Sequence, residues 1–405
     1  MRVSLRRTPL AIVGAVTIAL TLVVCASTSS AAERKTTEAP IVVGVICTCS
    51  AGGGFGGILH PGEEVYQAWA DSVNAAGGID GHPVKLITED DTGNPGTGLT
   101  DAQTLVSDHV DAVADLSLVD QTFESTLEAA KIPVVGALTY EGPFGTNPDF
   151  YPEAETNDAN GVSVISVAKA AGATNLANIY CAEAAICAQS VPVYEAAGKK
   201  LGVPVIYNAA ISATAPNYTA QCVAAQQAHV TSIFIGEAAP LIIKLAGDCA
   251  AQGYNPIYAL GGGGYAADLN SAPGLKKDST IAFSDIPFTA DTPAVHTAKA
   301  AIDKYYPGLF ENPTLFTEQN FFSWISGELL VDAVKAGGLT AGATPSSAEI
   351  VKGLHSLKGD TVDGLTPPLT YAAGKPNTVD CWFDAQIKNG KLTLLNHDRA
   401  SCEKG

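Results

Sequence analysis

The sequence predicts an α/β protein with two lobes, each built on a parallel sheet, joined by a hinge that the chain crosses more than once. Three observations lead to this fold. The 405 residues are enough for two or three domains. Apolar, strand-like runs alternate with helical patterns over the first part of the chain, and the same alternation then starts again. From about residue 282 it gives way to helical segments and a strand-like tail.

The first lobe begins at an apolar run, residues 40–46, which is typical of a buried parallel strand. Further strands are expected at residues 84–88, 112–116 and 132–137. Helices are expected from Pro61 to Gly77–Gly78, near 100–109 and near 121–131. Strand and helix therefore alternate through the whole segment, as in a parallel sheet covered by helices.

The second unit repeats this order. The pattern predicts helices at residues 161–171, 188–201, 217–228 and 240–252. Each precedes or follows an apolar strand, and these strands are expected at residues 176–181, 203–208, 231–235 and 256–260. The two units are alike in architecture, without a visible repeat of residues.

The C-terminal part predicts helices at residues 293–306, 319–336 and 347–357, and then a strand-like tail from residue 365. A return to the first lobe followed by a last crossing explains this order most economically. We therefore expect lobe 1 to comprise residues 40–155 and 288–363, and lobe 2 to comprise residues 156–284 and 364–405. Several crossings between the lobes would form a hinge.

Residues 1–32 have the pattern of a secretory signal. Three arginines precede the apolar run 10–24, which is too short to span a bilayer, and small residues around Ala31–Ala32 offer a cleavage point. Arg6–Arg7 leave a twin-arginine signal open. Cys25 resembles the lipidated cysteine of a bacterial lipoprotein, so we expect an exported chain that either keeps a lipid anchor at Cys25 or loses Cys25 with the signal.

The charge of the chain excludes some partners. Asp and Glu number 41 against 23 Lys and Arg, which gives a formal net charge of −18. An acidic surface repels phosphate backbones and anionic lipid headgroups. The sequence therefore predicts no nucleic-acid partner and no binding to a membrane surface.

Eight of the nine cysteines remain once Cys25 is set aside, and an even number in an exported chain favours disulfides. Closeness in sequence predicts the pairs Cys47–Cys49, Cys181–Cys187, Cys222–Cys249 and Cys381–Cys402. The cysteines are scattered and the histidines isolated, so we expect no metal cluster.

No motif supports an enzyme. The sequence contains no nucleophile elbow, no zinc-protease helix and no phosphate-binding P-loop. Residues 52–57 fit G-x-G-x-x-G, but the acid expected for dinucleotide binding comes too late, at Glu89, and a cleft-edge loop is the better interpretation. The acids at 89–91 are interpreted as solvated turn residues. We expect neither a cofactor nor a catalytic residue.

In open α/β sheets, ligands bind beyond the carboxyl ends of the strands. In the first lobe these ends are residues 50–57, 117–121 and 138–140; in the second they are residues 181–188, 236–240 and 261–265. Two such rims that face one another would form a cleft for a small molecule.

The turn Asn74-Ala-Ala-Gly-Gly-Ile-Asp-Gly81, within the helix, turn and acid-ended strand of residues 67–91, resembles a known family. This is the leucine/isoleucine/valine-binding-protein-like family of type I periplasmic solute-binding proteins, which serve ABC importers. Residues 131–135 are similar to its fourth strand, and residues 324–338 to its late lobe-one helix. The resemblance covers nearly all of residues 41–395. It implies two Rossmann-like lobes that close on a small solute, with an ABC permease in the membrane as partner.

The resemblance also implies ligand contacts. In the first lobe, Ser117 matches the serine beyond strand three, Leu138 and Tyr140 match residues that bind an amino-acid carboxylate, and Phe55 falls near an aromatic of the first loop. In the second lobe the family's tyrosine position falls around Ile186, and its acid position aligns with Leu241, with Glu237 the nearest acid. Tyr265 completes the second rim. Because the tyrosine is missing and the acid displaced, the ligand need not be an α-amino acid.

The leading hypothesis is an exported, monomeric solute-binding protein of an ABC importer, not an enzyme. Its ligand would be an amino acid or a small organic or aromatic acid, with an apolar body against Phe55, Tyr140 and Trp324. Two alternatives stay open. The same fold serves ligand-sensing receptors, and a secreted hydrolase would need a reactive group in the cleft, which the sequence does not display.

Overall fold

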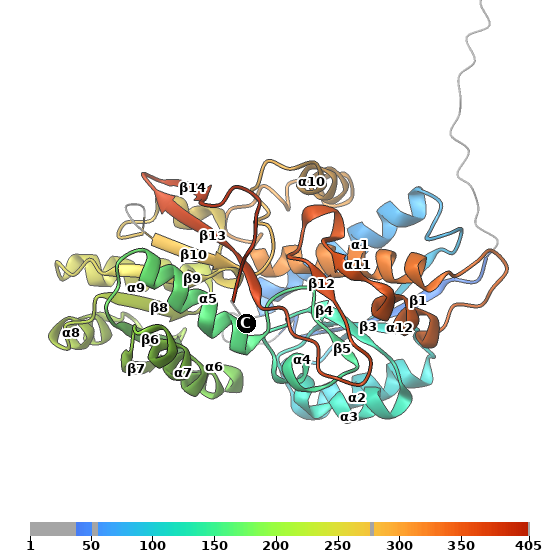
Figure 1. Ribbon diagram of the computed structural model, residues 1–405, viewed down its shortest axis with the longest axis horizontal. Helices are drawn as coiled ribbons and strands as arrows, with labels where there is room; N and C mark the ends of the chain where they lie inside the picture. Colours follow the sequence, from blue (N-terminus) through green and yellow to red (C-terminus); the bar gives the residue numbers. More distant parts are fainter. Residues whose placement is uncertain (1–37, 51–55, 276–278, 404–405) are drawn as a thin grey trace, which may run out of the picture. The chain divides into compact units, whose positions relative to one another are not determined.

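The computed structural model describes residues 38–50, 56–275 and 279–403 (Figure 1). The predicted signal at residues 1–32, with Cys25, and the candidate contact Phe55 lie outside the described residues. Within the described residues the chain forms two large sheets flanked by helices, which confirms the predicted α/β class.

The first sheet has five parallel strands in the order β2-β1-β3-β4-β5. They are β1 (Ile41–Cys47), β2 (Val84–Asp90), β3 (Ala112–Leu116), β4 (Val134–Ala137) and β5 (Phe150–Tyr151). β1 and β3 are almost completely buried, whereas the edge strand β2 is half-buried. Continuous apolar sequence suits the central strands because helices cover both of their faces.

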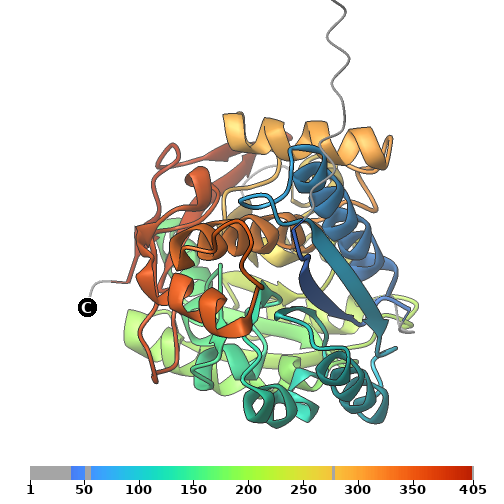
Figure 2. The same ribbon diagram turned by 90° about the vertical axis from the view of Figure 1, so that its right-hand side faces the viewer.

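Helices from an early and a late part of the chain pack around this sheet. The early ones are α1 (Gly56–Ala75), α2 (Pro95–Ser107), α3 (Glu124–Ala130), α4 (Gly142–Thr146) and the short 3₁₀ helix η1 (Asp120–Thr122). The late ones are α10 (Pro293–Tyr305), α11 (Glu318–Gly337) and α12 (Ser347–Ser356). α11 contacts α1, β3 and β4, and α12 packs on α11 (Figure 2). The chain thus returns to the first sheet, as the sequence predicts.

The second sheet has the order β14-β13-β10-β9-β8-β6-β7, with β15 beside β13. Its strands are β6 (Leu176–Cys181), β7 (Val205–Ile211), β8 (Ser232–Gly236), β9 (Ile257–Gly261), β10 (Ser279–Phe283), β13 (Cys381–Lys388), β14 (Lys391–Leu394) and β15 (Ser401–Cys402). Its helices are α5 (Asn157–Ala170), α6 (Ala185–Gln189), α7 (Val191–Leu201), α8 (Thr219–Gln227), α9 (Ala239–Ala251), η2 (Gly262–Gly264) and η3 (Ala267–Ser271). A small antiparallel pair joins β11 (Lys358–Asp360) to β12 (Leu369–Thr370), with η4 (Val362–Gly364) between them.

The second sheet corrects one expectation, because it is mixed and not fully parallel. β13 runs antiparallel to β10, and β14 runs antiparallel to β13. The turn between β13 and β14 is Asn389–Gly390, with φ angles of 52° and 74°. Asn-Gly tolerates this left-handed backbone and is the usual turn of a two-residue hairpin. The C-terminal hairpin therefore adds to the edge at β10 without a crossover helix.

Three segments of the chain connect the two sheets, namely residues 152–156, 284–292 and 371–380. They are bonded to one another and to α11. The hydroxyl of Tyr371 donates to the carbonyl of Pro152 at 2.7 Å, and the backbone N–H of Phe288 donates to the carboxylate of Glu318 at 3.3 Å. Such a triple connection is the multi-strand hinge expected from the sequence. The predicted lobe boundaries remain a proposal about which residues move together.

Two helices differ in extent from the prediction. α1 begins at Gly56, so Pro61 lies inside the helix instead of starting it. The expected helix at residues 188–201 is split into α6 and α7 at Ser190. Pro192 explains the split, because it has no N–H to continue the hydrogen-bond ladder and is favoured in the first turn of a new helix.

The structure contains the four disulfides that closeness in sequence predicts. Cys222–Cys249 joins α8 to α9, with both residues completely buried. A disulfide stabilises mainly by restricting the unfolded chain, and this one closes a loop with a sequence separation of 27.

The double substitution Cys222→Ala and Cys249→Ala is expected to lower the free energy of unfolding by ~3 kcal/mol. The loss arises from the larger entropy of the unfolded chain and from the missing sulfur atoms in the core. Urea unfolding followed by circular dichroism measures it. An unchanged midpoint in the double variant would contradict a stabilising role for this disulfide.

Candidate functional site

A cavity of about 150 Å³ lies at the carboxyl ends of the second sheet's strands. Asn178 and Tyr180 reach it from β6, Gly236 from the end of β8 and Gly261 from the end of β9. The strands of a parallel sheet end at the same edge, so residues far apart in sequence meet there. This is the second rim that the sequence predicts.

The first sheet and its helices contribute other residues to the same cavity. Leu118 follows β3, Tyr140 follows β4, and Gln319 and Phe322 lie near the start of α11. The amide of Gln319 donates to the hydroxyl of Tyr140 at 2.7 Å. One cavity is therefore lined by residues from both halves of the fold.

Two connecting segments meet the cavity at Glu155 and Ser284. One oxygen of the buried Glu155 carboxyl accepts hydrogen bonds from Asn160 at 2.7 Å, Ser163 at 3.1 Å and Ser284 at 3.3 Å. Burial raises the pKa of Glu155 to about 7, although these three bonds lower it. The hydroxyl of Tyr194 donates to Asn160 and extends the network along the cavity wall.

Glu237 lies at the end of β8 and lines the cavity with only 7% of its surface exposed. Neither of its carboxyl oxygens has a well-formed hydrogen bond within the described residues, although the adjacent backbone N–H of Ala238 lies close enough to lower its pKa. Burial, and to a lesser extent the neighbouring carboxylate of Glu183, raises the pKa of Glu237 to about 8. Its carboxyl group is therefore a buried polar group without a side-chain partner among the described residues.

Aromatic rings form much of the remaining wall. Tyr194 and Phe234 are stacked, with ring centroids 4.4 Å apart and an interplanar angle of 24°. Tyr140, Tyr180 and Phe322 add three more rings. Such flat apolar surfaces suit a solute with an aliphatic or aromatic body.

The structure brings three of the seven candidate contacts to the cavity. Tyr140, Ile186 and Glu237 line it, as positions beyond strand ends should. Tyr265 does not, because its ring is buried against Phe283, and its hydroxyl accepts a hydrogen bond from Asn270. Only the glycines that precede Tyr265 reach the cavity.

Ser117 and Leu138 also lie away from the cavity. The hydroxyl of Ser117 donates to Asp91 at 2.5 Å and accepts from the N–H of Val119, so it serves the turn after β3. Leu138 is completely buried in the core. Asp91 is itself buried and also accepts from Thr48 at 2.7 Å, so the interpretation of residues 89–91 as a solvated turn is wrong for Asp91.

Sequence reasoning missed Asn178, Tyr194 and Phe234. Asn178 lies in β6, and neither its amide nitrogen nor its oxygen has a partner within the described residues. A lone asparagine in an otherwise apolar strand is the signal that would have identified it. Tyr194 and Phe234 carry no such signal, because aromatic residues in a helix and a buried strand are typical of a core.

The sequence from residue 40 to residue 391 matches the family model for periplasmic binding proteins. The chain belongs to this family. It is a family of solute-binding proteins, which agrees with a cavity that both halves of the fold line. No curated protein matches the sequence.

Solved structures share the fold of this periplasmic binding protein. A fatty acid ABC transporter substrate-binding protein from Thermomonospora curvata is 17% identical, with a TM-score of 0.72 over 90% of this chain and 93% of that chain. A possible leucine/isoleucine/valine-binding protein from Rhodopirellula baltica is 16% identical, with a TM-score of 0.73 over 89% and 97%. A solute-binding protein of an ABC transporter from R. palustris, in complex with benzoate, is 14% identical, with a TM-score of 0.70 over 90% and 98%.

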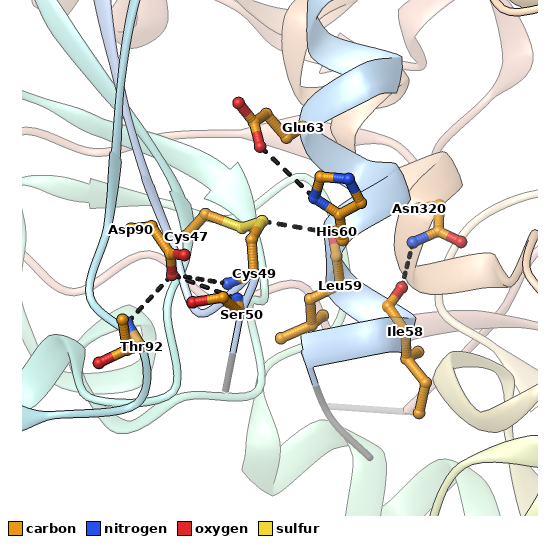
Figure 3. A network of polar contacts seen from close by, with 10 residues as sticks. All are labelled: Cys47, Cys49, Ser50, Ile58, Leu59, His60, Glu63, Asp90, Thr92 and Asn320. Atoms are coloured by element: carbon orange, nitrogen blue, oxygen red, sulfur yellow. Dashed lines mark hydrogen bonds and ion pairs between the residues drawn. A yellow bond between two sulfur atoms is a disulfide. The ribbon is translucent and has the colours of Figure 1, made fainter. Parts of the chain in front are cut away.

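A second cluster of polar residues surrounds the start of α1 (Figure 3). Cys49, His60 and Glu63 have potential metal-ligand atoms within 4.8 Å of one another. Cys49 is paired with Cys47, however, and a disulfide sulfur lacks the thiolate charge that a metal requires. His60 is exposed, Glu63 is half-buried, and their side chains lie 3.7 Å apart, as in a surface ion pair.

In the part of the chain that the structure describes, no helix of this periplasmic binding protein has both the length and the apolar character needed to cross a membrane.

Proposed function

We propose that this periplasmic binding protein captures a small solute in the cavity between its two sheets and presents it to an ABC permease. The observation that carries the proposal is the shared lining of the cavity. Tyr140 and Gln319 belong to the first half of the fold, and Asn178 and Glu237 to the second. A solute that touches both halves favours the conformation in which they lie close together.

The hinge supports a binding cycle of opening and closing. Three segments connect the halves, and two of them bring Glu155 and Ser284 to the cavity wall. A solute bound there contacts the hinge as well as both halves, so its binding stabilises one angle between the two halves. A permease would then distinguish the closed, loaded protein from the open, empty one.

The proposal places the protein outside the cytoplasm, as its family name implies. The signal pattern of residues 1–32 and the four disulfides support export. Anchoring through a lipid on Cys25 and a monomeric state are part of the same proposal. Amino acids and small organic or aromatic acids are the solutes that the sequence suggests, and the names of relatives include fatty acid and benzoate.

A thermal-shift screen with amino acids, amines, alcohols and organic acids tests the solute-binding role. A solute present at 100 times its Kd stabilises the folded protein by ~2.7 kcal/mol and raises the melting temperature. The half-exposed Ala184 lines the cavity, and Ala184→Trp should fill it and remove this shift while leaving the unliganded protein folded. If no compound in the screen raises the melting temperature, the solute-binding role is wrong.

A further inference from the structure

The ionisable groups of the cavity wall are all acids. Glu155 and Glu237 both line the cavity, whereas no Lys, Arg or His does so among the residues that the structure describes. An anion that entered would lose its hydration and meet carboxyl groups instead of a positive charge. A cation that entered would lose hydration as well, but a carboxylate beside it would compensate for that loss.

Glu237 is the group that most needs such a partner. Neither of its oxygens has a well-formed hydrogen bond within the described residues, and the charge of Glu183 disfavours its ionised form. A buried carboxylate without hydrogen bonds costs free energy unless a ligand supplies the missing donors. An ammonium group supplies several N–H donors and a compensating charge.

The aromatic wall favours the same ligand. Tyr194 and Phe234 present stacked rings, and Tyr140, Tyr180 and Phe322 also face the cavity. The faces of aromatic rings attract cations through their quadrupole, and the same rings provide apolar contact for the body of the solute.

Two of the amide donors that could hold a carboxylate are engaged with protein groups. The amide nitrogen of Asn160 donates to Glu155, and that of Gln319 donates to Tyr140. Ser117, expected to bind a carboxylate, lies away from the cavity and donates to Asp91. The positive end of α9 lies near the cavity, but Glu237 directly precedes this helix start. Asn178 is the one amide in the cavity with both polar atoms unpaired within the described residues.

We propose that the cavity takes an organic cation, an amine with an aliphatic or aromatic body, and that its ammonium group lies against Glu237. Asn178 would bind a further polar atom of the solute. This inference rests on the proposed solute-binding role and narrows it. It also replaces the expectation of a carboxylate-bearing solute, because the described residues at the place where the solute would lie include carboxyl groups and no cationic side chain.

Matched sets of probes test the proposal by isothermal titration calorimetry at constant pH. Each set has an amine, an alcohol and a carboxylate on the same body: 2-phenylethylamine, 2-phenylethanol and 3-phenylpropionate, and the corresponding members with butyl, cyclohexylethyl and indolylethyl bodies. L-phenylalanine adds a zwitterion. We expect amines to bind at least tenfold more tightly than the matched alcohols and carboxylates, and more tightly than the zwitterion.

The variant Glu237→Gln should reduce the preference for the amine at least tenfold and leave the affinity for the alcohol nearly unchanged. Glu128→Gln is the matched control, because Glu128 is an exposed acid on α3 that does not line the cavity. The melting temperature of unliganded Glu237→Gln should not fall below that of the wild type, since the change removes a buried carboxyl group without a side-chain partner among the described residues.

Tighter binding of the carboxylates, or equal binding of amines and alcohols, would overturn the cation proposal while the solute-binding role stands. The same holds if other compounds bind but no amine does. If no compound of any charge binds, the solute-binding role itself fails. The preference of the wild-type protein alone decides between these results, so the conclusion does not depend on the folding of a variant.

Discussion

Gly353→Ala is expected to destabilise the protein by roughly 3 kcal/mol or more, because the added methyl group has no space. Gly353 lies in α12 where this helix crosses α11. A Cβ atom there would lie 1.7 Å from the carbonyl oxygen of Ala333 and 2.8 Å from the backbone nitrogen of Gly337. Backbone atoms cannot rotate away as a side chain can, so the helices must separate. Separation would expose Ile350 and Leu354, which are buried beside Gly353.

A second helical glycine provides the matched control. Gly247 lies inside α9, and a Cβ atom at this position would have nothing within 4 Å. Alanine is the better helix former by roughly 0.5–1 kcal/mol, so Gly247→Ala should stabilise the protein slightly. Urea unfolding of the two variants, followed by the same probe, measures both effects. Similar midpoints for the two variants would show that the helices α11 and α12 tolerate the added atom.

This contrast also shows which parts of the fold the sequence can predict. Buried parallel strands such as β1 need uninterrupted apolar sequence, and local patterns are sufficient to predict the parallel strands β1–β4 and β6–β9. The close approach of Gly353 to Ala333 leaves no local pattern, because it depends on how two helices pack. The pairing of β10 with β13 is equally non-local, so the strand-like tail from residue 365 is predictable from the sequence but its place in the second sheet is not.

The candidate site, too, has features that the sequence predicts and features that it does not. Residues from five of the six expected strand ends line the cavity, because the rule of strand ends depends only on chain direction and on the order of strand and helix. It does not say which way a side chain points after the strand has ended. Tyr140 turns into the cavity, whereas Ser117 turns back toward Asp91. Asn178 lies within its strand and not beyond it, so no rule about strand ends could select it.

The protein is expected to become more stable as the pH falls from 8 to about 5. Many of its carboxyl groups are completely buried and lack positive neighbours. Burial raises the pKa of Glu155 to about 7 and that of Glu237 to about 8, and raises those of Asp115, Glu153 and Asp285 well above the usual range. In the unfolded chain these groups ionise near pH 4. Between these values the folded form holds protons that the unfolded form has lost.

The sign of the pH dependence follows from this difference. Where the folded form binds more protons than the unfolded form, the free energy of unfolding falls as the pH rises, by ~1.4 kcal/mol per pH unit for each extra proton. Each group stabilises the folded form fully below its unfolded pKa, and this stabilisation is lost as the pH rises through the folded pKa. His355, whose pKa burial lowers, opposes the trend with a single proton below about pH 6.5. Melting temperatures measured across this range at constant ionic strength should therefore decrease steadily with rising pH.

The hinge acids allow the cause to be separated from other effects of pH. Glu153 and Asp285 belong to two different connecting segments, both are completely buried, and the charge of Asp285 adds to the burial that raises the pKa of Glu153. The double variant Glu153→Gln and Asp285→Asn removes two of the groups that take up protons on folding and keeps similar side-chain shapes. It should be more stable than the wild type at pH 8, and its stability should vary less with pH.

A variant whose stability changes with pH as steeply as that of the wild type would show that these carboxyl groups do not ionise on unfolding. A wild-type melting temperature that rises with pH between 5 and 8 would contradict the whole explanation, since groups with raised pKa values can only produce the opposite slope.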